Sequence, residues 1–177
     1  SFLRHNNIVA ILGSRIGNYR GRLIVSERNA VTDSSLLPSF LLAKLLYRIA
    51  DAVVAVSRDV RFDVINEFGV GRERVHVIFN PYDFNKIAAR SLEPCQHAWL
   101  NQAEVPVILA AGRLATQKDS PTLLHAFKSV LAIRDCKLLI AGTGPLLEGL
   151  SAEVRMLGLD ESVEFLGFLS NPYAYMR

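Results

Sequence analysis

The sequence predicts an α/β protein made of two parallel-sheet units. Short apolar runs of strand length alternate with amphipathic stretches of helix length, which is the pattern of parallel strands joined by helical crossovers. The alternation fades between residues 83 and 103. We therefore expect one unit over 1–82 and another over 104–177, joined by a linker over 83–103 or by a loop that holds one short helix. Half of the 177 residues are hydrophobic, which is enough for a sizeable core.

The first unit should alternate between helices and strands throughout. The expected elements are a helix over 6–17, a strand over 21–26, a helix over 36–49, a strand over 51–56, a helix over 57–68 and a strand over 74–79. Ser57 is a favoured residue for a helix N-cap, and Gly69 suits the position after the same helix.

A polar cluster, Glu27-Arg28-Asn29, follows the first expected strand. In open α/β sheets, ligands bind beyond the carboxyl ends of strands, so these three residues are candidates for an acceptor-side site. An equally good interpretation is structural, with Arg28 and Glu27 forming a surface ion pair beside an asparagine turn.

The helix over 36–49 is strongly apolar, and Lys44 and Arg48 are four residues apart, so they share one side. Such a helix could rest on a membrane surface, or it could be largely buried with a narrow solvated edge. We favour burial. The apolar stretch Leu36–Ala50 is too short to span a bilayer.

The second unit repeats the alternation. We expect a strand over 105–111, an amphipathic helix that buries Leu124 and Phe127, a strand over 137–141, a helix from Pro145 to Gly158, a strand over 162–166 and a last helix opening at Asn171-Pro172.

The loop after the strand over 105–111 has the parts of an anion site. The strand breaks at Gly112-Arg113, the loop carries Lys118, and Asp119-Ser120-Pro121 is typical of a helix start. Open backbone amides and the helix dipole favour a phosphate at such a position. Arg113 could grip the phosphate with its planar fork and Lys118 could neutralise it. Cations in such loops are also common as merely solvated side chains.

Gly142-Thr143-Gly144 lies between a strand and a helix but lacks the third glycine of a dinucleotide fingerprint. A tight turn that lets the backbone approach a sugar or phosphate is the better interpretation.

Composition excludes several classes of protein. The net charge is +3 and no Lys/Arg cluster is interleaved with aromatic residues, so we expect no nucleic-acid partner. The two cysteines, Cys95 and Cys136, lack metal-site spacing and indicate free thiols in a reducing compartment. No signal peptide is visible, and we expect a cytoplasmic protein, with the inner face of the membrane as a further location.

Several of these segments together resemble glycosyltransferase family 4. They are Asn80-Pro81, AAGRLATQKD, KLLIAGTGP, VEFLGFLSNPY and, in the first unit, SERN followed by DAVVAVS. The resemblance implies a retaining transferase of the GT-B type, in which two Rossmann-like domains bind a nucleotide-diphosphate sugar and a glycan or lipid-linked acceptor. It also implies peripheral membrane contact.

The resemblance assigns roles to individual residues. Arg113 and Lys118 match the pair that holds the diphosphate and stabilises the leaving nucleotide, so no metal or other cofactor is expected. Donor-binding positions are matched by Gly112, Gly142, Gly144, Gly167, Phe168 and Leu169.

The match departs from the family at both ends. The family's Glu-x7-Glu motif should lie beyond Arg177, and the glycine-rich loop of the first turn is missing. We therefore expect two incomplete Rossmann-like units in a partial chain that binds donor weakly and transfers little or no sugar. Two alternatives remain: a non-catalytic nucleotide-sugar-binding or interaction module, and a sugar-nucleotide epimerase of the same fold.

Overall fold

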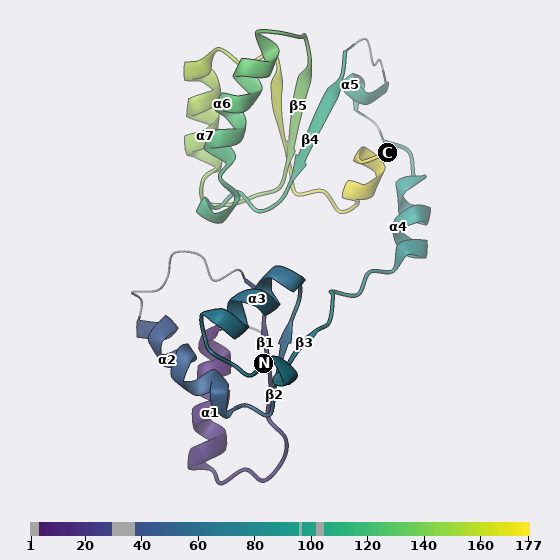
Figure 1. Cartoon of the computed structure of the whole chain (residues 1–177). Helices are drawn as coiled ribbons and strands as arrows, with labels where there is room; N and C mark the ends of the chain where they lie inside the picture. The colour runs from purple at the N-terminus through teal and green to yellow at the C-terminus, as the bar shows by residue number, and fades with distance from the viewer. Residues whose placement is uncertain (1–3, 30–37, 96, 102–104) are drawn as a thin grey trace. The chain divides into compact units, whose positions relative to one another are not determined.

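The computed structural model describes residues 4–29, 38–95, 97–101 and 105–177. The chain divides into two compact units, Ser1–Tyr82 and Asp83–Arg177 (Figure 1). Each unit holds an all-parallel sheet of three described strands, in the orders β1-β2-β3 and β4-β5-β6. The predicted fold class, α/β with two parallel-sheet units, is confirmed.

The first unit follows the predicted order of elements. They are α1 (Arg4–Ile16), β1 (Ile24–Glu27), α2 (Pro38–Leu46), the 3-10 turn η1 (Tyr47–Ile49), β2 (Ala52–Ala55), α3 (Arg58–Asn66), the 3-10 turn η2 (Arg72–Arg74) and β3 (Val75–Val77). Ser57 caps α3 as expected, since its Oγ accepts a hydrogen bond of 3.1 Å from the amide of Val60. Gly69 has a positive φ of 64°, which suits its place after the helix.

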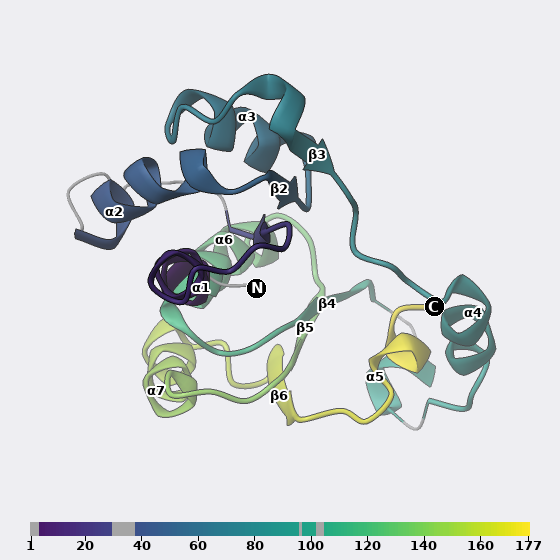
Figure 2. The same cartoon turned by 90° about the horizontal axis from the view of Figure 1, so that it is seen from below.

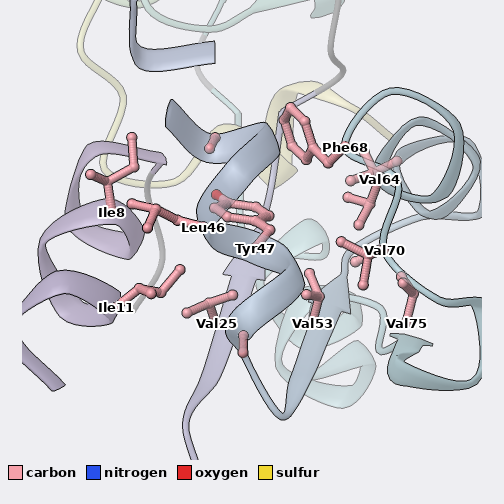
Figure 3. Packing of buried hydrophobic residues seen from close by; sticks show 14 of the residues in the cluster. Ile8, Ile11, Val25, Leu46, Tyr47, Val53, Val64, Phe68, Val70 and Val75 are labelled. Atoms are coloured by element: carbon pink, nitrogen blue, oxygen red, sulfur yellow. The ribbon is translucent and has the colours of Figure 1, made fainter. Parts of the chain in front are cut away.

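The core of this unit is built on β1 and β2. Side chains from α1, η1 and the end of α3 converge on Val25 and Val53 (Figure 3). Tyr47 and Phe68 are fully buried at its centre, with ring centroids 4.9 Å apart in an edge-to-face arrangement.

Helix α2 is buried along one side only. Its buried side chains are Phe40, Ala43 and Leu46, whereas Leu41, Leu42 and Leu45 are exposed. The exposed side of the helix, which we expected to be a narrow edge with Lys44 and Arg48, is therefore apolar. Lys44 and Arg48 do not share an edge of one α-helix, because α2 ends at Leu46 and the tighter turn η1 follows. Arg48 instead donates from Nε to the carbonyl oxygen of Phe68 at 3.0 Å.

The second unit also matches the predicted order, except that a short 3-10 turn stands where the last helix was expected. Its strands and long helices are β4 (Val107–Ala111), α6 (Ser120–Leu131), β5 (Lys137–Ala141), α7 (Leu147–Leu157) and β6 (Val163–Gly167), with the 3-10 turns η3 (Thr116–Lys118) and η4 (Pro172–Tyr175). Helices α6 and α7 pack together on one side of the sheet (Figure 1 and Figure 2). They cover Leu138 and Ile140 with Leu124, Phe127 and Leu150.

The segment expected as a linker forms two helices, α4 (Phe84–Ser91) and α5 (Ala98–Asn101). Asp83 caps α4 through a 2.9 Å hydrogen bond from the amide of Lys86. Helix α4 packs against η4 at the other end of the second unit. None of its side chains is buried, and hydrogen bonds from polar side chains join it to the segment before η4.

A polar network lies inside the first unit. Glu27 is 1 % exposed, and its Oε2 accepts a hydrogen bond of 2.8 Å from the Tyr47 hydroxyl. Asn7 donates from Nδ2 to the Tyr47 oxygen at 2.7 Å and to the carbonyl oxygen of Ser26 at 2.8 Å. Arg4 Nε lies 3.7 Å from the same carboxylate oxygen. Burial and the neighbouring Glu27 charge raise the pKa of the Tyr47 phenol far above its ordinary value.

In the second unit, the loops after β4 and β5 are bonded to each other. The amide of Leu114 donates to Thr143 at 3.0 Å, and the amide of Leu146 donates back to Leu114 at 3.2 Å. A Cβ atom on Gly144 would collide with the Leu114 carbonyl, and one on Gly142 would collide with the Gly112 carbonyl. The two glycines are therefore needed so that one loop backbone can lie directly against the other.

Substituting two glycines of this unit should change stability in opposite directions. Gly144→Ala should lower the free energy of unfolding by about 1–3 kcal/mol, the usual cost of overpacking. Gly149→Ala, on α7 with open space around it, should raise it by about 0.5–1 kcal/mol. Denaturant titration followed by circular dichroism measures both. Equal stability of Gly144→Ala and the wild type would contradict the contact between the loops.

Tyr47→Phe should change how the stability of the first unit depends on pH. At pH 7 the lost hydrogen bond to a charged group should cost about 1.5–3 kcal/mol. Above pH 10.0, the ordinary phenol pKa, unfolded tyrosine releases its proton while folded Tyr47 keeps it. The unfolded state then binds fewer protons, so wild-type stability falls as pH rises. The variant lacks this contribution. The difference in free energy of unfolding between wild type and Tyr47→Phe should therefore become smaller as pH rises.

Denaturant titrations at intervals between pH 7 and 11 test this dependence. Tyr19→Phe, whose side chain is exposed, is the control and should stay within about 0.5 kcal/mol of the wild type at pH 7. If the difference in free energy of unfolding between wild type and Tyr47→Phe stays constant from pH 7 to 11, the proposed effect of the Tyr47 pKa is ruled out.

Candidate nucleotide-binding site

A pocket of about 540 Å³ opens at the carboxyl ends of β4 and β5. This is the edge at which parallel sheets place their ligands. Its walls come from three loops, those after β4, β5 and β6. The lining residues are Ala111, Gly112, Arg113, Ala141, Gly142, Thr143, Gly144, Phe168, Leu169 and Pro172. Six of the eight residues assigned to donor binding line this pocket. Lys118 lines a smaller hollow that adjoins it, and Gly167 lines neither.

Arg113 and Lys118 are neighbours in this structure. Both line a hollow of about 110 Å³ that shares Gly112 with the larger pocket. The Lys118 chain folds back over Gly112, so that its Cε would lie 3.7 Å from a Cβ built on that glycine. Both side chains are exposed, and neither forms an ion pair or a side-chain hydrogen bond with the residues that the structure describes. Two cations without protein partners at one corner are suited to an anionic ligand.

Helix α6 begins beside these cations. Asp119 is its N-cap residue and Pro121 lies in the first turn, as the sequence predicts. Asp119 adopts a left-handed conformation, with φ 46° and ψ 45°, and its side chain makes no capping hydrogen bond. The first-turn amides are therefore not satisfied by that carboxylate. The positive end of the helix dipole adds to the charge of Arg113 and Lys118.

The third wall follows β6. Gly167 turns the chain with a positive φ of 66° and accepts a hydrogen bond of 2.7 Å from the amide of Gly142. Phe168 is 79 % exposed although its ring borders the pocket. A large exposed aromatic at the rim of a pocket offers a flat surface on which a planar ligand could stack.

The three acceptor-side candidates fall into two groups. Glu27 is buried and bound to Tyr47, so it is not at the surface and the surface ion pair of the structural interpretation is wrong. Arg28 and Asn29 are exposed just beyond β1. Arg28 Nη2 donates to Oδ1 of Asn80, which follows β3. The Asn29 amide lies 3.5 Å from Glu27 Oε1, so the buried carboxylate supports the turn that presents Arg28.

Sequence reasoning missed several residues of these sites. Thr143 and Pro172 line the pocket, and Asn80 holds Arg28. A polar residue directly after an expected strand was the available signal for Asn80, which we named only as part of the family resemblance. No group of three or more potential metal ligands occurs among the described residues. Within that same part of the chain, no helix is long and apolar enough to cross a bilayer.

Comparison with known proteins agrees with the geometry. Residues 14–86 match the family described as Glycosyltransferase Family 4, and residues 96–177 match Glycosyl transferases group 1. The chain is 30% identical over 182 residues to an N-acetylgalactosamine-N,N'-diacetylbacillosaminyl-diphospho-undecaprenol 4-alpha-N-acetylgalactosaminyltransferase of Campylobacter jejuni, covering 99% of this chain and 47% of that protein. It is 33% identical over 143 residues to the mannosylfructose-phosphate synthase of Agrobacterium fabrum, covering 72% and 30%.

A solved structure shares the fold. HepE of Anabaena, crystallised with UDP and glucose, superimposes with a TM-score of 0.78 at 20% identity, over 99% of this chain and 49% of that one. The chain thus spans half or less of the length of the proteins that it matches here. Because two glycosyltransferase models together match 14–86 and 96–177, the chain belongs to the glycosyltransferases of family 4 and group 1.

Proposed function

We propose that the second unit binds the nucleotide-diphosphate part of a sugar donor, and that the protein is a retaining glycosyltransferase. The observation that carries the proposal is the pairing of Arg113 and Lys118, without protein partners among the described residues, beside a pocket of about 540 Å³. HepE, a neighbour in fold, was crystallised with UDP and with UDP-glucose, which supports a nucleotide as the ligand.

The proposed chemistry needs a stabilised leaving group. In sugar transfer the bond between the anomeric carbon and the diphosphate oxygen breaks, and its electron pair leaves with the nucleoside diphosphate. The guanidinium of Arg113 and the ammonium of Lys118 would stabilise the negative charge that develops on that oxygen. Two fixed cations can take this role without a metal ion, and we propose that they do so here.

The acceptor is proposed to approach from the first unit. Arg28, Asn29 and Asn80 lie at the carboxyl edge of its sheet, where ligands of such sheets bind. The Campylobacter relative is named for transfer to a diphospho-undecaprenol acceptor. This supports a glycan or lipid-linked acceptor. Because the chain spans half or less of its relatives, we expect donor binding from these 177 residues and little or no sugar transfer.

Replacing the arginine fork should weaken nucleotide binding. Arg113→Ala removes a charged hydrogen bond to the diphosphate, which should cost about 1.5–3 kcal/mol, or roughly 10- to 150-fold in Kd. Isothermal titration calorimetry with UDP and with GDP measures the loss and identifies the preferred base. Arg134→Ala, an exposed arginine before the amino end of β5, is the matched control and should bind as the wild type does.

An unchanged Kd in Arg113→Ala would remove this residue from the site. Incubation with radiolabelled UDP-sugars and GDP-mannose separates the remaining possibilities. Nucleotide binding together with transfer by a longer form of the protein supports the enzyme. Binding without transfer in any form supports a non-catalytic module, and conversion of the donor sugar itself supports an epimerase.

We also propose peripheral contact of the first unit with a membrane. The support is the outer side of α2, where Leu41 and Leu45 are 55 % and 65 % exposed. No acidic residue occurs in α1 or α2, while Arg15 and Lys44 do. Apolar side chains flanked by cations are suited to the interface of an anionic bilayer.

Leu45→Ser should reduce binding to vesicles of phosphatidylglycerol and phosphatidylcholine by on the order of tenfold, because a buried leucine side chain contributes about 1.5–3 kcal/mol. Cosedimentation measures the bound fraction. Phe62→Ser, an equally exposed apolar residue on α3, should bind as the wild type does. Equal binding of Leu45→Ser and wild type would exclude α2 as the contact.

A further inference from the structure

The wall formed by Phe168, Leu169 and Pro172 has no regular structure until η4 begins. Its near end is fixed to the β5 loop through Gly167 and Gly142. Its far end needs a separate support, because a segment without ladder hydrogen bonds gains no rigidity from the sheet. That support comes from α4, about 80 residues earlier in the chain.

Two side chains join α4 to this wall by reciprocal hydrogen bonds. Arg90 donates from Nη2 to the carbonyl oxygen of Ser170 at 2.7 Å. Asn171 donates from Nδ2 to the carbonyl oxygen of Arg90 at 2.9 Å and to Oε2 of Glu93 at 2.7 Å. The Arg90 guanidinium also lies 5.9 Å from the ring centroid of Tyr173. We call this set of contacts the α4 clamp.

Asn171 uses its amide for two separate tasks. Its Oδ1 accepts from the amide of Tyr173 at 3.2 Å and so caps η4, which is a local contact. Its Nδ2 makes the long-range contacts with α4. Because donor and acceptor are separate atoms, a substitution can remove one task and keep the other.

The α4 side of the clamp lies where neither family model reaches. The matched segments are 14–86 and 96–177, and Arg90 and Glu93 lie between them. Helix α4 nevertheless belongs to the same compact unit as the pocket. Its contacts therefore act on the pocket wall directly and not through the rest of the sheet.

We infer that Arg90 and Asn171 are positioning residues for the nucleotide pocket, and that α4 and the bound nucleotide stabilise each other. The inference rests on the proposed function, since it needs a nucleotide in the pocket. A ligand that orders Phe168–Pro172 favours the docked state of α4, and by linkage a docked α4 favours the ligand. If the wall moves freely, only the fraction of molecules with the wall in place can bind the nucleotide. The apparent affinity then falls in proportion to that fraction.

Asn171→Asp separates the two tasks of Asn171. Aspartate caps a helix as well as asparagine does, but it cannot donate to Arg90 or Glu93, and its charge repels the Glu93 carboxylate. We expect UDP to bind this variant roughly 5- to 30-fold more weakly, the equivalent of one or two net hydrogen bonds. Ser91→Ala, whose hydroxyl bonds only Ala88 within α4, should bind UDP as the wild type does.

Amide hydrogen exchange, measured by mass spectrometry with and without saturating UDP, distinguishes positioning from a general loss of stability. In the wild type and in Ser91→Ala, UDP should slow exchange over 84–92 as well as at the pocket. In Asn171→Asp the slowing over 84–92 should disappear, while exchange over α6 and α7 stays at the wild-type rate. Arg113→Ala should weaken binding yet leave 84–92 as protected without ligand as in the wild type.

The possible outcomes separate the inference from the proposed function. If wild type binds neither UDP nor GDP, the proposed function fails and the inference fails with it. If wild type binds UDP, but Asn171→Asp binds equally well and shows the same slowing over 84–92, only the inference is overturned. Should Asn171→Asp fail to fold, Arg90→Ala removes the other bond of the clamp, the one from the Arg90 guanidinium to Ser170, and the same two results decide the question.

Discussion

The backbone contact between the loops after β4 and β5 is the constraint on which the candidate site depends. Gly142 and Gly144 have no side chains to hold the loops apart, so Leu114 and Thr143 can bond directly. This contact fixes the direction in which the chain leaves β4. It thereby sets where Arg113 lies, how Lys118 folds over Gly112 and where α6 begins. The positions of the two cations therefore depend on the hydrogen bonds between the two loops.

The periodic part of the fold could be predicted from the sequence, and so could most of the pocket. The strands ending at Glu27, Ala111 and Ala141 are short apolar runs, which have few other interpretations in a chain that alternates with amphipathic helices. Once the strands are parallel, their carboxyl ends must share an edge. Arg113, Gly142 and Phe168 therefore meet there although they are far apart in sequence.

The features that could not be predicted depend on side chains distant in the sequence. Nothing near Glu27 in the sequence indicates that Tyr47 and Asn7 will surround it, so a buried carboxylate looked like a surface residue. Arg48 left its expected edge because α2 ends one turn early. The role of α4 was hidden because Arg90 and Asn171 bond to backbone carbonyl oxygens and to the Glu93 carboxylate, and such polar contacts leave no pattern in the sequence.

Helix α4 has a consequence for building chimeras from related enzymes. The two family matches leave residues 87–95 unassigned, so the boundary between them falls within α4 or just after it. A junction after Tyr82 would transfer α4 together with its partners Ser170 and Asn171. A junction at residue 95 would join the rest of the second unit from one enzyme to the α4 of another. The pocket wall would then contact an α4 whose side chains need not match Ser170 and Asn171.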